Sequence, residues 1–155
     1  MKISKKTQYG LRAMVYLAHS RFKNKVCPLK KISKDEEIPF DFLEKIFSNL
    51  EKSNLVKAKK GAQGGYFLAK KPEEIKVGQI IRVLEGTMAP VLCIAAEKEK
   101  RIFCPKKKYC LTKNIWLKIQ EILNFTLDSI TLADLIKPHR TLPFYKKSGA
   151  YGVRK

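Results

Sequence analysis

Three cysteines in the second half of the chain form the group best suited to chemistry. Cys93, Cys104 and Cys110 are separated by ten and then five residues, a looser spacing than the C-x2-C pairs of zinc ribbons. The cations of the same stretch are Lys98, Lys100, Arg101, Lys106, Lys107 and Lys108. Thiolates beside cations can hold an iron-sulfur cluster (2Fe-2S or 4Fe-4S), with the lysines offsetting its negative charge. Reduced cysteines without a metal are the alternative.

The fourth cysteine, Cys27, stands alone before Pro28 and is expected to be a small packed residue. The chain contains no apolar stretch that predicts a signal peptide or a membrane span of about 18 residues. We therefore expect a cytoplasmic protein with no membrane partner. Thiols are kept reduced there, which favours metal ligation over disulfides.

The charge of the chain indicates a polyanionic partner. Its 155 residues include 33 Lys and Arg against 14 Asp and Glu, a net charge of +19 that is spread along the whole chain. The length suits one compact unit rather than a large two-domain enzyme. There is no phosphate-binding loop of the G-x4-G-K-S/T form, and the histidines, His19 and His139, have no paired catalytic carboxylates. We therefore do not expect an enzyme.

Apolar periodicity predicts three helices followed by a hairpin. The helices are expected at about 5–19, 28–38 and 39–50, and alternating residues around the glycine-rich turn 61–65 predict two strands. This order is typical of a winged helix-turn-helix, in which the third helix enters the major groove of DNA and the hairpin forms the wing. The expected fold class is mainly α with a small β-hairpin wing.

The second half of the chain adds a further helix up to Gly86 and a long helix from about 111 to 129. In the long helix, Trp116, Leu123 and Leu127 belong to an apolar stripe wider than one small domain needs. The expected organisation is a winged helix-turn-helix DNA-binding domain at 1–86, a cysteine-containing loop at 87–110, the long helix and terminal turn at 111–137, and a basic tail, expected to be disordered, at 138–155.

The chain resembles the winged-helix transcription regulators of the Rrf2 family, the IscR, NsrR and CymR type. The matching stretches follow in order as MKIS (1–4), YGLRA (9–13), FLEKIF (42–47), GAQGGYFL (61–68), VGQIIRVLEG (77–86) and LDSITLADL (127–135). The resemblance implies a homodimer of winged-helix units joined by the long helix. Cluster-binding members carry three cysteines ahead of that helix, which implies that Cys93, Cys104 and Cys110 are cluster ligands.

The third helix is expected to place side chains on base edges. Glu44 and Lys45 lie where the family reads its operator, with Phe40 and Asp41 nearby. A solvated pair on an exposed helix face is the alternative.

Phosphate contacts are expected from two other places. The wing turn has lysines beside glycines, so its backbone can approach DNA closely, although the turn can equally be a simple hairpin loop. The start of the first helix offers polar and basic groups that add affinity without sequence choice. The residues expected there are Lys59, Lys60 and Gly64 in the wing, and Ser4, Lys5 and Lys6 in the first helix.

The sequence departs from the family pattern at the fourth cluster ligand. Family members of the best-known type have a histidine three residues beyond the third cysteine, where this chain has Lys113. Other members use a carboxylate near the start of the first helix, donated by the second subunit, where this chain has Gln8. The fourth ligand is therefore unknown.

The function predicted from the sequence is that of a homodimeric transcriptional regulator, a repressor, that binds a palindromic double-stranded DNA operator. It would sense redox state, nitric oxide or iron-sulfur status through the cluster. A cluster-free winged-helix regulator is one alternative. A basic RNA-associated protein with a structural zinc is another.

Overall fold

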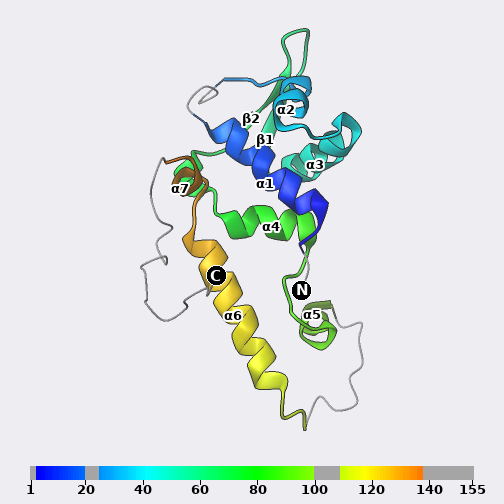
Figure 1. Cartoon of the computed structure of the whole chain (residues 1–155), viewed down its shortest axis with the longest axis vertical. Helices are drawn as coiled ribbons and strands as arrows, with labels where there is room; N and C mark the ends of the chain where they lie inside the picture. Colours follow the sequence, from blue (N-terminus) through cyan, green and yellow to red (C-terminus); the bar gives the residue numbers. More distant parts are fainter. Residues whose placement is uncertain (1–2, 20–24, 100–108, 138–155) are drawn as a thin grey trace, which may run out of the picture.

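The computed structural model describes residues 3–19, 25–99 and 109–137. Figure 1 shows the first four helices, the hairpin and the last short helix gathered at one end, with the long helix α6 projecting away from them. In chain order the elements are α1 (Lys5–Ala18), α2 (Leu29–Glu36), α3 (Phe40–Lys52), β1 (Val56–Lys59), β2 (Gly65–Leu68), the 3-10 helix η2 (Pro72–Glu74), α4 (Val77–Glu85), α5 (Leu92–Glu99), α6 (Lys113–Ser129) and α7 (Leu132–Ile136).

Helix α1 runs through the centre of the folded end and packs on α3, α4 and α7. Its buried face, which includes Met14 and Leu17, joins Ile46 and Phe47 of α3 in the main core. Gly10 allows α1 to cross α4 closely, because a Cβ atom there would lie 2.1 Å from Cδ1 of Leu84. The three helices predicted before the hairpin are confirmed.

The wing is an antiparallel hairpin in which Val56 pairs with Leu68 and Lys59 pairs with Gly65. Its base is joined to the chain ahead of α2, since the backbone of Cys27 donates to and accepts from the backbone of Tyr66, both at 2.9 Å. Gly65 is required at this point, because its φ is +157° and a Cβ atom would lie 2.2 Å from the Cys27 carbonyl oxygen. The predicted wing is therefore present and is supported by a third stretch of chain.

The C-terminal end of α6 is fixed to α4. The backbone N–H of Val77 donates to Ile130 at 2.9 Å, and Arg82 Nη2 lies 2.6 Å from Asp128 Oδ1. None of the described side chains of α6 is fully buried, and Ile122 and Phe125 are 54% and 65% exposed. The predicted stripe residues Trp116, Leu123 and Leu127 are thus only half-buried in one subunit.

The expectation of a loop throughout residues 87–110 is wrong for its first part, because Leu92–Glu99 forms helix α5. This octapeptide, LCIAAEKE, has no glycine or proline and consists mainly of good helix formers. Residues 100–108 and the basic tail at 138–155 lie outside the described residues, so the expectations for them remain predictions. Within the described ranges, every helix is too short or too polar to cross a membrane.

Candidate DNA-binding surface and cysteine segment

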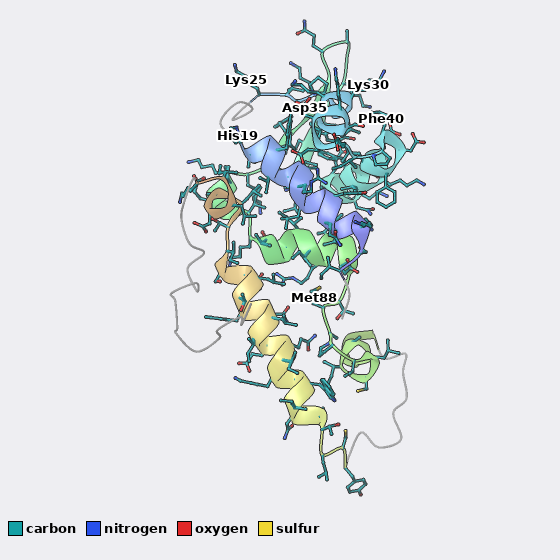
Figure 2. All side chains as sticks on the ribbon, in the orientation of Figure 1. His19, Lys25, Lys30, Asp35, Phe40 and Met88 are labelled. Carbon is teal, nitrogen blue, oxygen red and sulfur yellow. The ribbon has the colours of Figure 1, made fainter. Side chains whose placement is uncertain are left out.

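The outer face of α3 presents three of the predicted DNA contacts. Burial of Leu43, Ile46, Phe47 and Leu50 fixes the orientation of the helix. Asp41, Glu44 and Lys45 then lie exposed on its solvent side. Phe40, which Figure 2 labels at the start of α3, is half-buried and packs against the main core, so its ring supports the helix start.

Phe42 is a candidate contact that the sequence reasoning missed. It is 39% exposed, and its ring meets that of Tyr9 edge to face at a centroid distance of 5.8 Å. An exposed aromatic ring beside a recognition surface can contact a thymine methyl group. The available signal was a large apolar residue one position off the buried stripe of α3.

The wing tip carries exposed Lys59 and Lys60 on a turn that only glycine can form. Gly61 has a φ of +117°, and the N–H of Gly64 donates to the carbonyl of Gly61 at 2.9 Å. A Cβ atom on Gly64 would lie 2.5 Å from the carbonyl oxygen of Lys59. The hairpin and α3 lie at the same end of the molecule (Figure 1). The residues predicted to contact bases and the wing residues predicted to contact phosphates therefore lie at one end.

At the start of α1 the predicted contacts separate into two kinds. Lys5 is exposed and can reach a phosphate. Ser4 caps the helix, accepting from the N–H of Thr7 at 3.3 Å, and its hydroxyl donates to the carboxylate of Glu85 at 2.7 Å. Because the Ser4 hydroxyl already donates to the Glu85 carboxylate, Ser4 is a weaker candidate for a phosphate contact than Lys5.

The cysteine segment, residues 87–110, contributes two described candidate ligands. Cys93 lies half-buried on α5, and Cys110 lies half-buried ahead of α6 with its Sγ 3.4 Å from Thr112 Oγ1. Cys104 lies outside the described residues. In the described part of the chain no three His, Cys, Asp or Glu side chains stand close enough to hold a metal ion. The donor chemistry fits an iron-sulfur cluster, since thiolates are its usual ligands.

Cys27 differs from the other cysteines. Its side chain is fully buried, and burial raises the pKa of its thiol to about 11. The prediction of a small packed residue is confirmed, and a thiol that stays protonated is a poor metal ligand.

The candidate fourth ligands lie in different places. The amide of Gln8 donates to the Ile3 carbonyl at 3.0 Å, and Lys113 is the first residue of α6. His19 caps the opposite end of α1, far from Met88 and the segment that follows it (Figure 2).

The family profile described as Rrf2, iron-dependent transcriptional regulator, matches residues 3–138. The chain belongs to the Rrf2 family. Among its relatives, the HTH-type transcriptional regulator CymR of Bacillus subtilis is 38% identical over 135 residues, covering 87% of this chain and 89% of the relative. The protein rrf2 of Nitratidesulfovibrio vulgaris is 34% identical over 143 residues, which is 92% of each.

Solved structures agree with this assignment to the Rrf2 family. The structure of CymR, the global cysteine regulator of B. subtilis, has a TM-score of 0.70 at 35% identity and covers 88% of this chain and 96% of its own. The IscR of T. potens has a TM-score of 0.68 at 39% identity, covering 88% and 86%. The fold is therefore the winged-helix fold of these regulators. This Rrf2 protein is a DNA-binding transcriptional regulator and not an enzyme.

Proposed function

We propose that this Rrf2 protein is a homodimeric repressor whose affinity for a palindromic operator is set by an iron-sulfur cluster on Cys93, Cys104 and Cys110. The observation that carries the proposal is the position of these thiols between the DNA-binding unit and the long helix α6. A change there alters the stretch of chain that connects the part that binds DNA to the part expected to pair the subunits.

At the DNA, α3 reads bases and the rest of the surface fixes its position. The carboxylate of Glu44 can accept a hydrogen bond from a cytosine amino group, and Lys45 can donate to a guanine edge. Lys59 and Lys60 of the wing and Lys5 of α1 neutralise phosphates, which adds affinity for any sequence. The exposure of these side chains supports this division of roles.

The homodimer is supported by the apolar side chains that α6 exposes, Ile115, Ile122 and Phe125. Pairing of this helix with its symmetry mate would bury them and would set the spacing of two recognition helices on two half-sites. Arg82 of α4 and Asp128 of α6 form an ion pair. The distance between two paired α6 helices would therefore also set the distance between the two DNA-binding units.

When bound, the cluster supplies a site that oxidants, nitric oxide or iron shortage can alter or remove. The three cysteines hold it, the neighbouring lysines of the segment offset its charge, and Gln8 or Lys113 supplies a weak or exchangeable fourth position. Such a site is labile, which suits a sensor better than a structural centre.

Spectroscopy of anaerobically purified protein tests the cluster directly. We expect a brown chromophore with iron and acid-labile sulfide, which is abolished by serine at Cys93, Cys104 or Cys110. Cys27→Ser is the matched control and should leave the spectrum unchanged, since this thiol is buried and protonated. Absence of iron and sulfide after reconstitution would contradict the proposal.

A cluster-free regulator is the second candidate. It is favoured by the similarity to CymR, the global cysteine regulator of B. subtilis. In that case DNA binding persists in protein that contains no iron, and the three cysteines can be replaced together without changing affinity. A colourless protein that contains zinc would instead support a structural zinc site.

A further inference from the structure

The carboxylate of Glu85, the last residue of α4, is bonded to the first turn of α1. Its Oε2 atom accepts from the backbone N–H of Ser4 at 3.1 Å, from the Ser4 hydroxyl at 2.7 Å and from the Thr7 hydroxyl at 2.5 Å. Thr7 is 1% exposed, so its hydroxyl has little access to water. Bonds to an ionised acceptor are about twice as strong as neutral ones, and these bonds lower the pKa of Glu85.

An apolar contact reinforces this polar one. Met88, three residues after Glu85, is 6% exposed and belongs to a small cluster against which Ile3, the residue before Ser4, packs. The other buried members of this cluster are Val77, Ile81 and Ile130. The chain that enters α1 and the chain that leaves α4 are therefore held together by polar contacts of Glu85 and by an apolar cluster.

Glu85 lies between two parts of the chain that the proposed function uses, the start of α1 and the cysteine segment. On one side, Lys5 directly follows Ser4 and is an expected phosphate contact. On the other side, Gly86 turns the chain out of α4 with a φ of +85°, and the chain continues to Cys93 on α5. None of the contacts of Glu85 just described involves the outer face of α3.

We infer that Glu85 is a positioning residue that holds the phosphate-contacting start of α1, and that the cysteine segment changes DNA affinity through this contact. The inference rests on the proposed function, because it takes the cysteine segment to be the part that responds to a signal. A movement of residues 86–93 displaces Glu85 and Met88 and releases Ser4 and Lys5. Since phosphate contacts carry no sequence information, the signal scales affinity for all DNA and leaves base preference unchanged.

The positioning role is tested by Glu85→Ala in the full chain, with binding measured on a preferred duplex selected from a random pool and on random DNA. Both affinities should fall by the same factor, about threefold to tenfold, and the slope of log K against log salt should shrink by about one to two. An unchanged salt slope, or a loss confined to the preferred duplex, would overturn the inference.

Asp134→Ala is the matched control. The Asp134 carboxylate accepts from the backbone N–H of Thr131 at 3.0 Å and from its hydroxyl at 2.7 Å, and these bonds lower its pKa, as for Glu85. It caps α7 and not α1, so a comparable loss of stability should leave DNA binding unchanged.

Thr7→Val serves as a second test variant if Glu85→Ala fails to fold. A buried side chain cannot touch DNA, so an effect of Thr7→Val on binding acts through the contacts of its hydroxyl with Glu85 and Ser4.

The coupling is tested with N-ethylmaleimide in a Cys104→Ser, Cys110→Ser protein, in which Cys93 is the remaining half-exposed thiol. Modification should weaken binding to the preferred and random duplexes by one common factor, and that shift should disappear in the Glu85→Ala or Thr7→Val background. A shift that persists there, that affects the preferred duplex alone or that is absent altogether would overturn the coupling. This measurement needs no iron, so failure of the cluster proposal is seen separately in the iron and sulfide analysis.

Discussion

Glu44 and Lys45 are exposed neighbours on α3, whereas Lys5 is exposed on a different helix, so their roles at DNA can be separated. Glu44→Ala should cost about 1 to 3 kcal/mol on the preferred duplex and relax the choice of one base pair, because a lost base contact affects sequence preference. Lys5→Ala should weaken binding to every sequence alike and reduce the salt slope by about one. Fluorescence anisotropy on specific and random duplexes checks both. Equal losses for Glu44→Ala on the two duplexes would exclude it as a base reader.

Cys27 provides a second test at the residue scale. Burial raises its thiol pKa from 9.0 to about 11, so iodoacetamide at pH 8 should alkylate Cys93 well before Cys27 in the folded protein. Peptide mapping by mass spectrometry measures the order, and both should react in urea. The raised pKa also means that burial of the neutral thiol contributes stability below pH 9, which is lost as the pH rises toward 11. Equal alkylation rates in the native state would contradict the buried position.

Single residues could be predicted from the sequence where their role depends only on neighbouring residues along the chain. The glycines of the wing turn and the packed Cys27 follow from local backbone and burial rules, and the structure confirms them. The contact of Ser4 with Glu85 joins residues 81 positions apart, and neither periodicity nor spacing signals such a pair. Ser4 was therefore predicted as a phosphate contact on its residue type alone, without its carboxylate partner.

At the scale of elements, periodicity predicted α1 to α4, the hairpin and α6, because each has one buried face or stripe. Helix α5 does not follow from periodicity, because the five apolar residues of LCIAAEKE are consecutive and mark no single face, although the local helix propensity is high. The contact between α4 and α6 could not be predicted from the sequence either. Gly78 is a helix-weakening residue by type, and only the structure shows that it lies against Asp128 of α6. In the structure, a Cβ atom on Gly78 would lie 2.1 Å from Asp128 Oδ1.

This contact between α4 and α6 predicts the effect of Gly78→Ala. The added methyl group must displace the Asp128 carboxylate and break its 2.6 Å bond to Arg82. The variant should lose the contribution of this partly exposed pair, up to about 1 kcal/mol of unfolding free energy, which offsets the gain of about 0.5 to 1 kcal/mol that alanine ordinarily brings over glycine inside a helix. Urea unfolding measures the net change. Glu121→Ala is the control, since Glu121 lies exposed on α6 away from this contact and pairs with Lys118 alone among the described ion pairs. A midpoint raised as for an ordinary Gly→Ala change in a helix would mean that α6 is not held to α4 in this way.

At the scale of the molecule, the expected DNA-binding surface and the exposed apolar side chains of α6 lie in different parts of the structure. The hairpin and α3 lie at one end, and α6 extends away from them (Figure 1). A charge of +19 attracts any nucleic acid, so it supplies affinity without specificity. In the proposed homodimer, specific binding therefore depends on holding two copies of α3 at a fixed spacing.

Assembly through α6 is tested by Ile122→Glu. The Ile122 side chain is 54% exposed, so the variant should fold, but a carboxylate placed in the proposed seam between paired α6 helices would be costly to desolvate. We expect light scattering to show monomers, with Glu121→Ala, one position away on the same helix, remaining dimeric. The monomer should keep its affinity for random DNA within a few-fold while losing its advantage on the palindromic duplex, because it meets only one half-site. An Ile122→Glu protein that remains a dimer would place the subunit interface on another surface, and the exposed stripe of α6 would then need a different partner.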